Sequence, residues 1–269
     1  MKFSILNCSL FALLFIAACT DEDSSLQTTD TAVVEAYLFA GQSLDTVKIF
    51  QSTSYASDDS TRIPLDGLLV ALSDGTDTFQ LESVGEGLYQ GLDFQIQSGR
   101  SYALAFAYNQ STVSAETYVP TLKEATASTS EITMSKIEAG TFPNFDEMPD
   151  PIELEWDNTE GDYFYVVVQN IEDDPEVINE LFEDEGRGFR FISEPQITDF
   201  YVIEPRREIQ QFGMHRIVIF RVNPEYAALY ETSSTTSTTI TQPPSNVVNG
   251  LGLFTGVSSD TLFLNVKKG

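Results

Sequence analysis

The feature of this sequence that most constrains its fold is an alternation of apolar and polar residues with a period of two, which recurs from Ala32 onward. Successive side chains of a β-strand point to opposite faces, so this period is typical of strands buried on one side. The alternating runs are short, and turn signals such as Asp74-Gly75 and Gly85-Glu86-Gly87 separate them. The sequence therefore predicts an all-β protein.

The first part of the alternating region predicts a series of strands at a spacing of roughly ten residues. These strands cover residues 33–39, 46–54, 67–73, 76–82, 87–94, 101–108 and 113–119. In the strand 101–108, Tyr102, Leu104, Phe106 and Tyr108 share one face, which we expect to be the core face. This arrangement favours an immunoglobulin-like or transthyretin-like β-sandwich over residues 32–122.

A second β-sandwich domain is expected over residues 131–269, because residues 123–130 are small and polar and predict a linker. In Ile152-Glu153-Leu154-Glu155-Trp156 the lone tryptophan shares a face with Ile152 and Leu154. Such a tryptophan opposite the apolar run 163–168 is typical of a fibronectin-like sandwich. The predicted strands are 132–137, 152–156, 163–169, 200–203, 214–222 and 261–266, with helical patches at 175–182 and 224–231 and an exposed Ser/Thr-rich loop at 233–242.

The N-terminus predicts attachment to a membrane through lipid. Lys2 precedes an apolar run that ends at Ala18, which is typical of a signal peptide over residues 1–18 and is too short to span a bilayer. Ile16-Ala17-Ala18-Cys19 resembles the bacterial lipobox, whose cysteine is acylated, with palmitate among the usual chains. The alternative is an ordinary signal peptide that contains a cysteine. No cysteine follows Cys19, so its thiol has no disulfide partner, and we predict lipidation at Cys19.

Residues 19–31 predict a flexible acidic tether, which begins with Thr20-Asp21-Glu22-Asp23. This cluster resembles the signal that exports lipoproteins to the cell surface of Bacteroidota; a solubilising linker is the alternative. The chain carries 14 basic and 41 acidic residues, a formal net charge of −27. Such a charge repels nucleic acid and anionic lipid. We therefore expect a lipid-anchored protein of the outer membrane, at the cell surface rather than the periplasmic face, with no nucleic-acid partner.

Residues suited to catalysis are few. His215 is the single histidine, and alternation groups it with Ile217 and Ile219, so we expect a structural role for it. The mature chain lacks the several histidines or cysteines of a zinc site, and it contains no Gly-x-Ser-x-Gly elbow. Glu153 and Glu155 are predicted to face solvent. The sequence thus predicts no catalytic residue, no cofactor and no metal ligand.

The acidic clusters and the apolar residues in loops each have two possible roles. Acidic clusters could hold Ca²⁺, although none has the spaced acidic pattern of a calcium loop, and solvated loops explain them equally well. These clusters are Asp58-Asp59, Asp146-Glu147 with Asp150, and Asp173-Asp174. Apolar side chains outside strand patterns could mark a protein interface or close the ends of a sandwich. They are Phe142, Phe145, Met148, Phe189 and Phe191.

One segment near the C-terminus combines turn residues with a strand pattern, and it reads Ser245-Asn246-Val247-Val248-Asn249-Gly250-Leu251-Gly252-Leu253-Phe254. It resembles the Ser-Asn-hydrophobic-x-Asn-Gly-Leu-Gly-hydrophobic-Phe signature of a family of Bacteroidota outer-membrane lipoproteins that is defined by a domain of unknown function, of the forty-two forty-nine type. Segments 33–38, 63–70, 87–89 and 99–104 are weaker matches to the same family. The resemblance implies display at the outer membrane near a TonB-dependent receptor, with no assigned enzymatic activity and no binding residues to transfer.

Three functions are compatible with these observations. We favour a non-catalytic accessory or binding subunit of an outer-membrane complex such as a TonB-dependent transporter, in contact with its β-barrel protein. The second is a free-standing adhesion or ligand-binding module for glycan or protein. The third, remote, is a carboxylate-dependent hydrolase, which requires two acids facing each other across a cleft.

Overall fold

The computed structural model describes residues 30–52, 62–138, 140–141, 149–180, 189–233 and 244–269. Over these residues the protein is built of β-strands with two short helices, so the all-β prediction is confirmed. The strands up to residue 119 are β1 (Ala32–Phe39), β2 (Ser43–Gln51), β3 (Ile63–Pro64), β4 (Ala71–Ser73), β5 (Thr78–Gln80), β6 (Glu82–Gly85), β7 (Leu88–Gln95), β8 (Arg100–Tyr108) and β9 (Ser111–Val119). The later elements are β10 (Ala125–Ala127), β11 (Glu131–Met134), β12 (Ile152–Trp156), β13 (Tyr163–Asn170), β14 (Arg190–Ile192), β15 (Gln196–Ile197), β16 (Phe200–Ile203), α1 (Pro205–Glu208), β17 (Gly213–Val222), α2 (Pro224–Ser233), β18 (Val247–Val248) and β19 (Leu251–Lys268).

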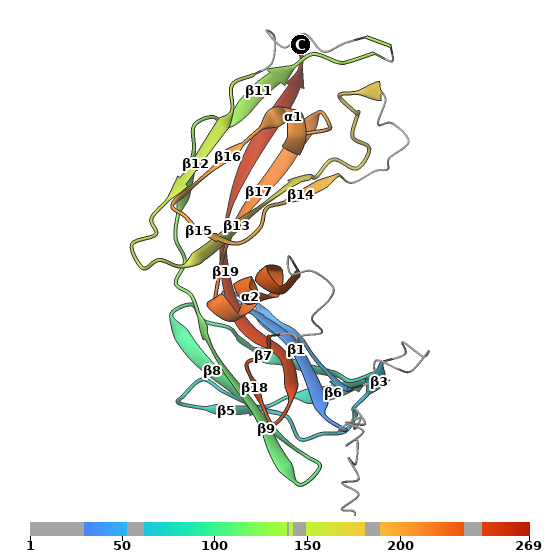
Figure 1. The fold of residues 1–269 in the computed structure, drawn as a ribbon, viewed down its shortest axis with the longest axis vertical. Coiled ribbons are helices and arrows are strands. Elements are labelled where there is room, and N and C mark those ends of the chain that lie inside the picture. The colour runs from blue at the N-terminus through green and yellow to red at the C-terminus, as the bar shows by residue number, and fades with distance from the viewer. Residues whose placement is uncertain (1–29, 53–61, 139, 142–148, 181–188, 234–243) are drawn as a thin grey trace, which may run out of the picture.

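One sheet of eleven strands extends along the molecule (Figure 1). Its main path is β14-β13-β17-β19-β1-β2-β7-β6, while β11, β15 and β3 pair with β19, β13 and β2. The strand pairs are antiparallel, except that β19 runs parallel to both β1 and β11. The two halves of the sheet therefore meet on β19, the last strand of the chain.

The first hydrophobic core lies between the half of this sheet that contains β1, β2 and β7 and a sheet of five strands, β18-β9-β8-β4-β5. Strand β1 buries every second residue, which places Val34, Ala36 and Leu38 in the core. From the opposite sheet, β8 contributes Tyr102 and Leu104, as well as Phe106, and these are at most 3% exposed. The predicted core face of residues 101–108 is thereby confirmed.

The second hydrophobic core lies between the other half of the large sheet and a sheet of three strands, β10-β12-β16. Strand β12 buries Ile152, Leu154 and Trp156 and exposes the two glutamates between them, as predicted. Trp156 stacks on Phe164 of β13 with ring centroids 5.1 Å apart, and its indole nitrogen donates to the Thr198 carbonyl oxygen at 2.9 Å. The indole therefore joins both sheets around this core.

Strand β19 passes from the first core into the second (Figure 1). Phe254 is buried in the first core, whereas Leu264 and Val266 are buried in the second. Val247 also lies in the first core, although residue 247 falls within the predicted second domain. The predicted domain boundaries stay a prediction, but the two cores share this strand.

Three local predictions can be compared with the structure. The predicted linker 123–130 contains β10, whose Ala125 pairs with Trp156; its alanines and threonine are too small to give an apolar alternation. The predicted helix at 224–231 is confirmed as α2, but the one at 175–182 is wrong for residues 175–180. There, Val177 and Asn179 form bridges with Gln211 and Ile137, because burying Ile178 in the second core holds the backbone extended.

Candidate functional site

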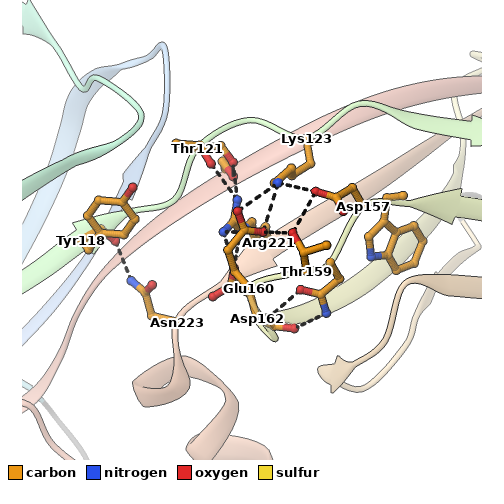
Figure 2. Close-up of polar contacts among 12 residues, drawn as sticks. Tyr118, Thr121, Lys123, Asp157, Thr159, Glu160, Asp162, Arg221 and Asn223 are labelled. Carbon is orange, nitrogen blue, oxygen red and sulfur yellow. Dashed lines mark hydrogen bonds and ion pairs between the residues drawn. The ribbon is translucent and has the colours of Figure 1, made fainter.

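Arg221 lies at the waist of the molecule, which we define as the level at which β17 ends beside Val257 and Ser258 of β19. The guanidinium is 6% exposed and donates from Nη1 to the carbonyl oxygen of Thr121 at 3.0 Å and to its hydroxyl at 2.8 Å (Figure 2). Nε donates to the Asp162 carboxylate at 2.7 Å, and Nη2 contacts the same oxygen. One buried arginine thus ties the chain that leaves the first core to β17 and to the loop before β13.

A surface network surrounds this arginine (Figure 2). Lys123 lies 2.6 Å from a carboxylate oxygen of Asp157 and 3.1 Å from one of Glu160, and Glu160 lies 3.9 Å from Arg221 Nη2. The hydrogen bond to Asp157 raises the pKa of Lys123, and the same bond lowers the pKa of Asp157. Both acids are at least half exposed, so these ion pairs contribute little to stability beside the buried contact of Arg221.

Asn223 and Glu225 form a second set of hydrogen bonds at the waist. The Asn223 side chain donates to the carbonyl oxygens of Tyr118 at 2.7 Å and Gly256 at 3.2 Å, so it joins β9 to β19 (Figure 2). Glu225, at the start of α2, accepts from the Thr117 hydroxyl at 3.0 Å and from Thr255 at 3.2 Å. Because β9, β19 and α2 are bonded to one another here, the two cores are held in one relative orientation.

On the sheet face turned away from the cores, α2 and three strands form an aromatic cluster, which comprises Tyr37, Tyr165, Phe220, Tyr226 and Tyr230. Tyr226 stacks on Tyr165 with centroids 5.5 Å apart and meets Tyr37 edge-on at 6.2 Å. Tyr165 in turn stacks on Phe220 at 4.8 Å. Burial raises the pKa of Tyr226 and of Tyr165, so both rings stay neutral and act as packing surfaces. The cluster bridges β1 of one core and β13 and β17 of the other.

A hollow of about 300 Å³ opens on the β1–β2 hairpin beside this cluster. We call it the hairpin hollow, and it is lined by Glu35, Tyr37, Phe39, Gln42, Ser43, Asp45, Thr46 and Lys48. Its lining combines aromatic rings with short polar side chains. Lys48 lies 3.2 Å from Glu35, and Arg62 approaches the other oxygen of this carboxylate at 3.3 Å.

A second hollow, of about 550 Å³, lies at the opposite end of the first core, where β1 begins. Tyr108 donates its hydroxyl to Asp30, Asn109 donates to the Asp30 carbonyl oxygen at 2.9 Å, and Asn249 donates to the Thr112 carbonyl oxygen at 2.9 Å. Burial and the bond to Asp30 raise the pKa of Tyr108 to about 12. The side-chain donors of Tyr108, Asn109 and Asn249 are therefore used within the protein.

The predicted lipidation site, Cys19, lies outside the described residues. His215 is 3% exposed in β17, and its Nδ1 lies 3.1 Å from the Gly213 carbonyl oxygen. Burial lowers the pKa of this histidine. It faces the second core with Ile217 and Ile219, as its alternation predicted, and the structure gives it no serine or cysteine partner among its hydrogen bonds in the described part of the chain.

The acidic candidates do not form a site in the described residues. Glu153 and Glu155 are exposed on the outer side of β12. Asp150, Asp173 and Asp174 belong to no group of metal-ligating side chains within the ranges that the structure describes. The candidates Asp58, Asp59, Asp146 and Glu147 lie outside those ranges.

One buried carboxyl that the sequence did not single out is Glu208, which is 2% exposed. Its Oε1 accepts a hydrogen bond from the Tyr201 hydroxyl at 3.1 Å, and its Oε2 has no partner among the described residues. Burial raises the pKa of Glu208. Because the carboxyl is closed to solvent, a substrate does not reach it in this conformation.

Of the apolar side chains predicted to lie outside the strand patterns, Phe189 and Phe191 are within the described residues. Phe191 packs against the second core and lies 6.4 Å from the ring of Tyr201, so it closes the core rather than marking an interface. Phe189 is partly buried. Phe142, Phe145 and Met148 lie outside the described residues.

The segment 245–254, the most specific part of the sequence pattern, has a structural role. Asn246 donates to the Phe254 carbonyl oxygen at 2.7 Å and accepts from the Phe254 amide at 3.0 Å, which closes the loop between β18 and β19. Asn249 adopts a φ of 55°, and Gly252 a φ of 107°. A side chain at Gly252 would collide with the Val34 carbonyl oxygen. The pattern therefore lets the chain cross between two sheets and lay β19 directly against β1.

Sequence reasoning missed the residues of the waist. A signal for Arg221 was present, because an arginine follows four apolar residues in Ile217-Val218-Ile219-Phe220-Arg221, and such a charge needs a partner if the strand is buried. The spacing of Tyr226 and Tyr230 likewise places two rings on one side of a helix. The partners of these residues come from other strands and carry no sequence signal.

Comparison with known proteins gives one match at the level of a family. One protein-family model matches residues 20–262, which include nearly all of the described chain. No curated protein matches the sequence. Among the described residues, neither helix has the length and apolar character needed to cross a membrane.

Proposed function

The chain belongs to the family described as Domain of unknown function (DUF4249), and we propose, from its sequence and geometry, that it is a non-catalytic lipoprotein of the outer membrane. Lipid on Cys19 anchors it, and it serves as an accessory or binding subunit of an outer-membrane complex such as a TonB-dependent transporter. The cell surface is the proposed location.

We also propose that the two cores belong to two β-sandwich units behind the lipidated tether, the first immunoglobulin-like or transthyretin-like and the second fibronectin-like. The placement of each core between part of the large sheet and a smaller sheet supports this. Two sheets packed face to face around one core are the defining arrangement of a sandwich.

The observation that carries the proposed function is the rigid connection between the two cores. The 18 residues of β19 form one strand, which at about 3.3 Å per residue extends roughly 60 Å. Near the middle of this strand, Asn223 donates to the Gly256 carbonyl oxygen, and Ser258 donates to Thr121, which also accepts from Arg221. A protein of this kind holds the surfaces of its two cores at a fixed distance from each other, which suits an accessory subunit that contacts a partner with both.

The position of the chain ends fits attachment at one end. β1 begins at one end of the molecule, and the C-terminus lies at the other (Figure 1). From Cys19 to the start of β1 the chain has 13 residues, which span at most about 45 Å when fully extended. Lipid on Cys19 would therefore keep the start of β1 within about 45 Å of the membrane.

Affinity purification of the tagged native lipoprotein in a mild detergent tests the accessory role. We expect a β-barrel protein to be recovered with it in a constant ratio, and the Arg221→Ala variant to recover less, because it loses the bonds from Arg221 to Thr121 and Asp162 at the waist. The Arg216→Ala variant, altered at an exposed arginine of the same strand, serves as the control. Recovery of the lipoprotein alone, while known barrel complexes survive the same detergent, would contradict the proposal.

A free-standing ligand-binding module is the second candidate, and the hairpin hollow is the observation that favours it. This function predicts a protein isolated without a barrel that binds a soluble ligand saturably. Protease treatment of intact cells tests the proposed location of either candidate, since a protein on the cell surface is trimmed whereas a periplasmic one is protected.

A further inference from the structure

The hairpin hollow contains polar side chains that have no partner among the described residues. Tyr37, Gln42, Ser43, Asp45 and Thr46 line it, and none of their side chains makes a hydrogen bond or ion pair to the residues that the structure describes. In the larger hollow beside Asp30, by contrast, the side-chain donors of Tyr108, Asn109 and Asn249 are bonded internally. Hydrogen-bonding capacity is therefore concentrated in the smaller hollow.

The same hollow presents two aromatic rings, Tyr37 and Phe39, from alternate positions of β1. Side chains two residues apart on a strand point to the same face, so both rings lie on the floor of the hollow. Tyr37 is held edge-on by Tyr226 of α2 at 6.2 Å, and the backbone of Phe39 is held in the sheet by its pairing with Val257. The apolar surface of the hollow is thus preformed, which lowers the entropic cost of binding.

The charges around the hollow disfavour an anionic ligand. Lys48 is paired with Glu35 at 3.2 Å and is not free to bind an anion, and the carboxylate of Asp45 repels one. The net charge of −27 acts in the same direction. A ligand that combines an apolar face with many hydroxyl groups satisfies both the rings and the polar side chains.

We propose that the hairpin hollow is a saccharide-binding site. One pyranose ring lies with its apolar face on Tyr37 or Phe39, and its hydroxyl groups exchange hydrogen bonds with Gln42, Asp45 and Thr46. The volume of about 300 Å³ is at the lower end of the range of ligand pockets, roughly 300–1,000 Å³, and suits one or two sugar units rather than a long chain in a deep cleft.

Ligand-observed NMR on the detergent-solubilised full chain tests this site. The probes are the methyl glycosides of glucose, galactose, mannose and N-acetylglucosamine, together with choline as a cationic probe. We expect saturation transfer to at least one glycoside, with binding weakened about tenfold by Tyr37→Ala and by Asp45→Ala. The Tyr118→Ala variant, altered at a tyrosine that is 44% exposed away from the hollow, should bind as the unaltered protein does.

Each outcome of this experiment either supports or overturns the saccharide site. Absence of transfer to all four glycosides overturns the proposal, and so does binding of choline alone, since the hollow would then be a cation site. If Tyr37→Ala disturbs the fold through its contact with Tyr226, Asp45→Ala and Gln42→Ala replace it, because both side chains are exposed. Binding that survives in both of these variants also overturns the saccharide site. The result is independent of barrel recovery, so the accessory role and the saccharide site can fail separately.

Discussion

Arg221 of β17 donates two hydrogen bonds to Thr121, a residue 100 positions earlier in the chain, at 3.0 Å and 2.8 Å. Thr121 follows β9 of the first core, whereas β17 belongs to the second. The carbonyl oxygen of Thr121 also accepts from Ser258 of β19 at 3.2 Å. Thr121 is thereby bonded to both β17 and β19, and the buried Arg221 is one of the groups that connect the two cores.

The Arg221→Ala variant should lower the free energy of unfolding by about 2–4 kcal/mol, since it removes several charge-assisted bonds and leaves Asp162 without its partner. Asp162 is 31% exposed, which keeps the loss below that of a fully buried pair. Urea denaturation followed by the fluorescence of Trp156, the single tryptophan, measures the change in the second core. The control Arg216→Ala should cost less than about 1 kcal/mol. Equal losses in the two variants would contradict the assigned role of Arg221.

The Gly252→Ala variant should destabilise the protein by more than about 2 kcal/mol, because the added carbon meets the Val34 carbonyl oxygen and the φ of 107° is unfavourable for alanine. Gly75→Ala is the matched control. Gly75 has a φ of 85° but open space around it, so only backbone strain of about 1 kcal/mol is expected there. Thermal unfolding of both variants measures the difference. A loss at Gly252 no greater than that at Gly75 would show that close packing of β19 on β1 is not required.

His215 should titrate below 6.5, because burial disfavours its charged form and lowers its pKa. Its folded pKa is depressed, so the unfolded chain binds the proton more readily as the pH falls below 6.5. The stability contributed by the neutral ring is therefore complete above pH 6.5 and decreases as the pH falls toward the folded pKa. The imidazole resonance of this single histidine can be followed by NMR without assignment of other residues. A midpoint at or above 6.5 would contradict the prediction.

The Cys19→Ser variant should lose both lipid labelling and membrane association, because a serine hydroxyl does not form the thioether on which lipoprotein processing depends. Cells grown with an alkyne-modified palmitate allow the label to be detected on the purified protein. Cys8→Ser is the matched control, since residue 8 lies in the predicted signal peptide and the change leaves Cys19 in place. Persistent labelling of Cys19→Ser would rule out the proposed anchor.

The sequence alone determined which faces of the strands are buried. The alternation in Ile152-Glu153-Leu154-Glu155-Trp156 and in residues 101–108 is a local property, since neighbouring side chains of a strand must point to opposite sides. The confirmed core positions of Leu154, Trp156 and Leu104 follow from it. The expectation of lipid on Cys19 is local in the same sense, because it depends on the residues that precede the cysteine.

Only the tertiary structure decided which strands are neighbours. Thr117 bonds to Gly256 across 139 residues, and Arg221 to Thr121 across 100. No short pattern encodes such pairs, because each partner is an ordinary residue until the chain brings it close. The same holds for the hairpin hollow. In the sequence its polar side chains resemble those of any solvated loop, and only folding places Tyr37 beside Tyr226. The shared strand β19 and the fixed waist are therefore products of packing between distant segments.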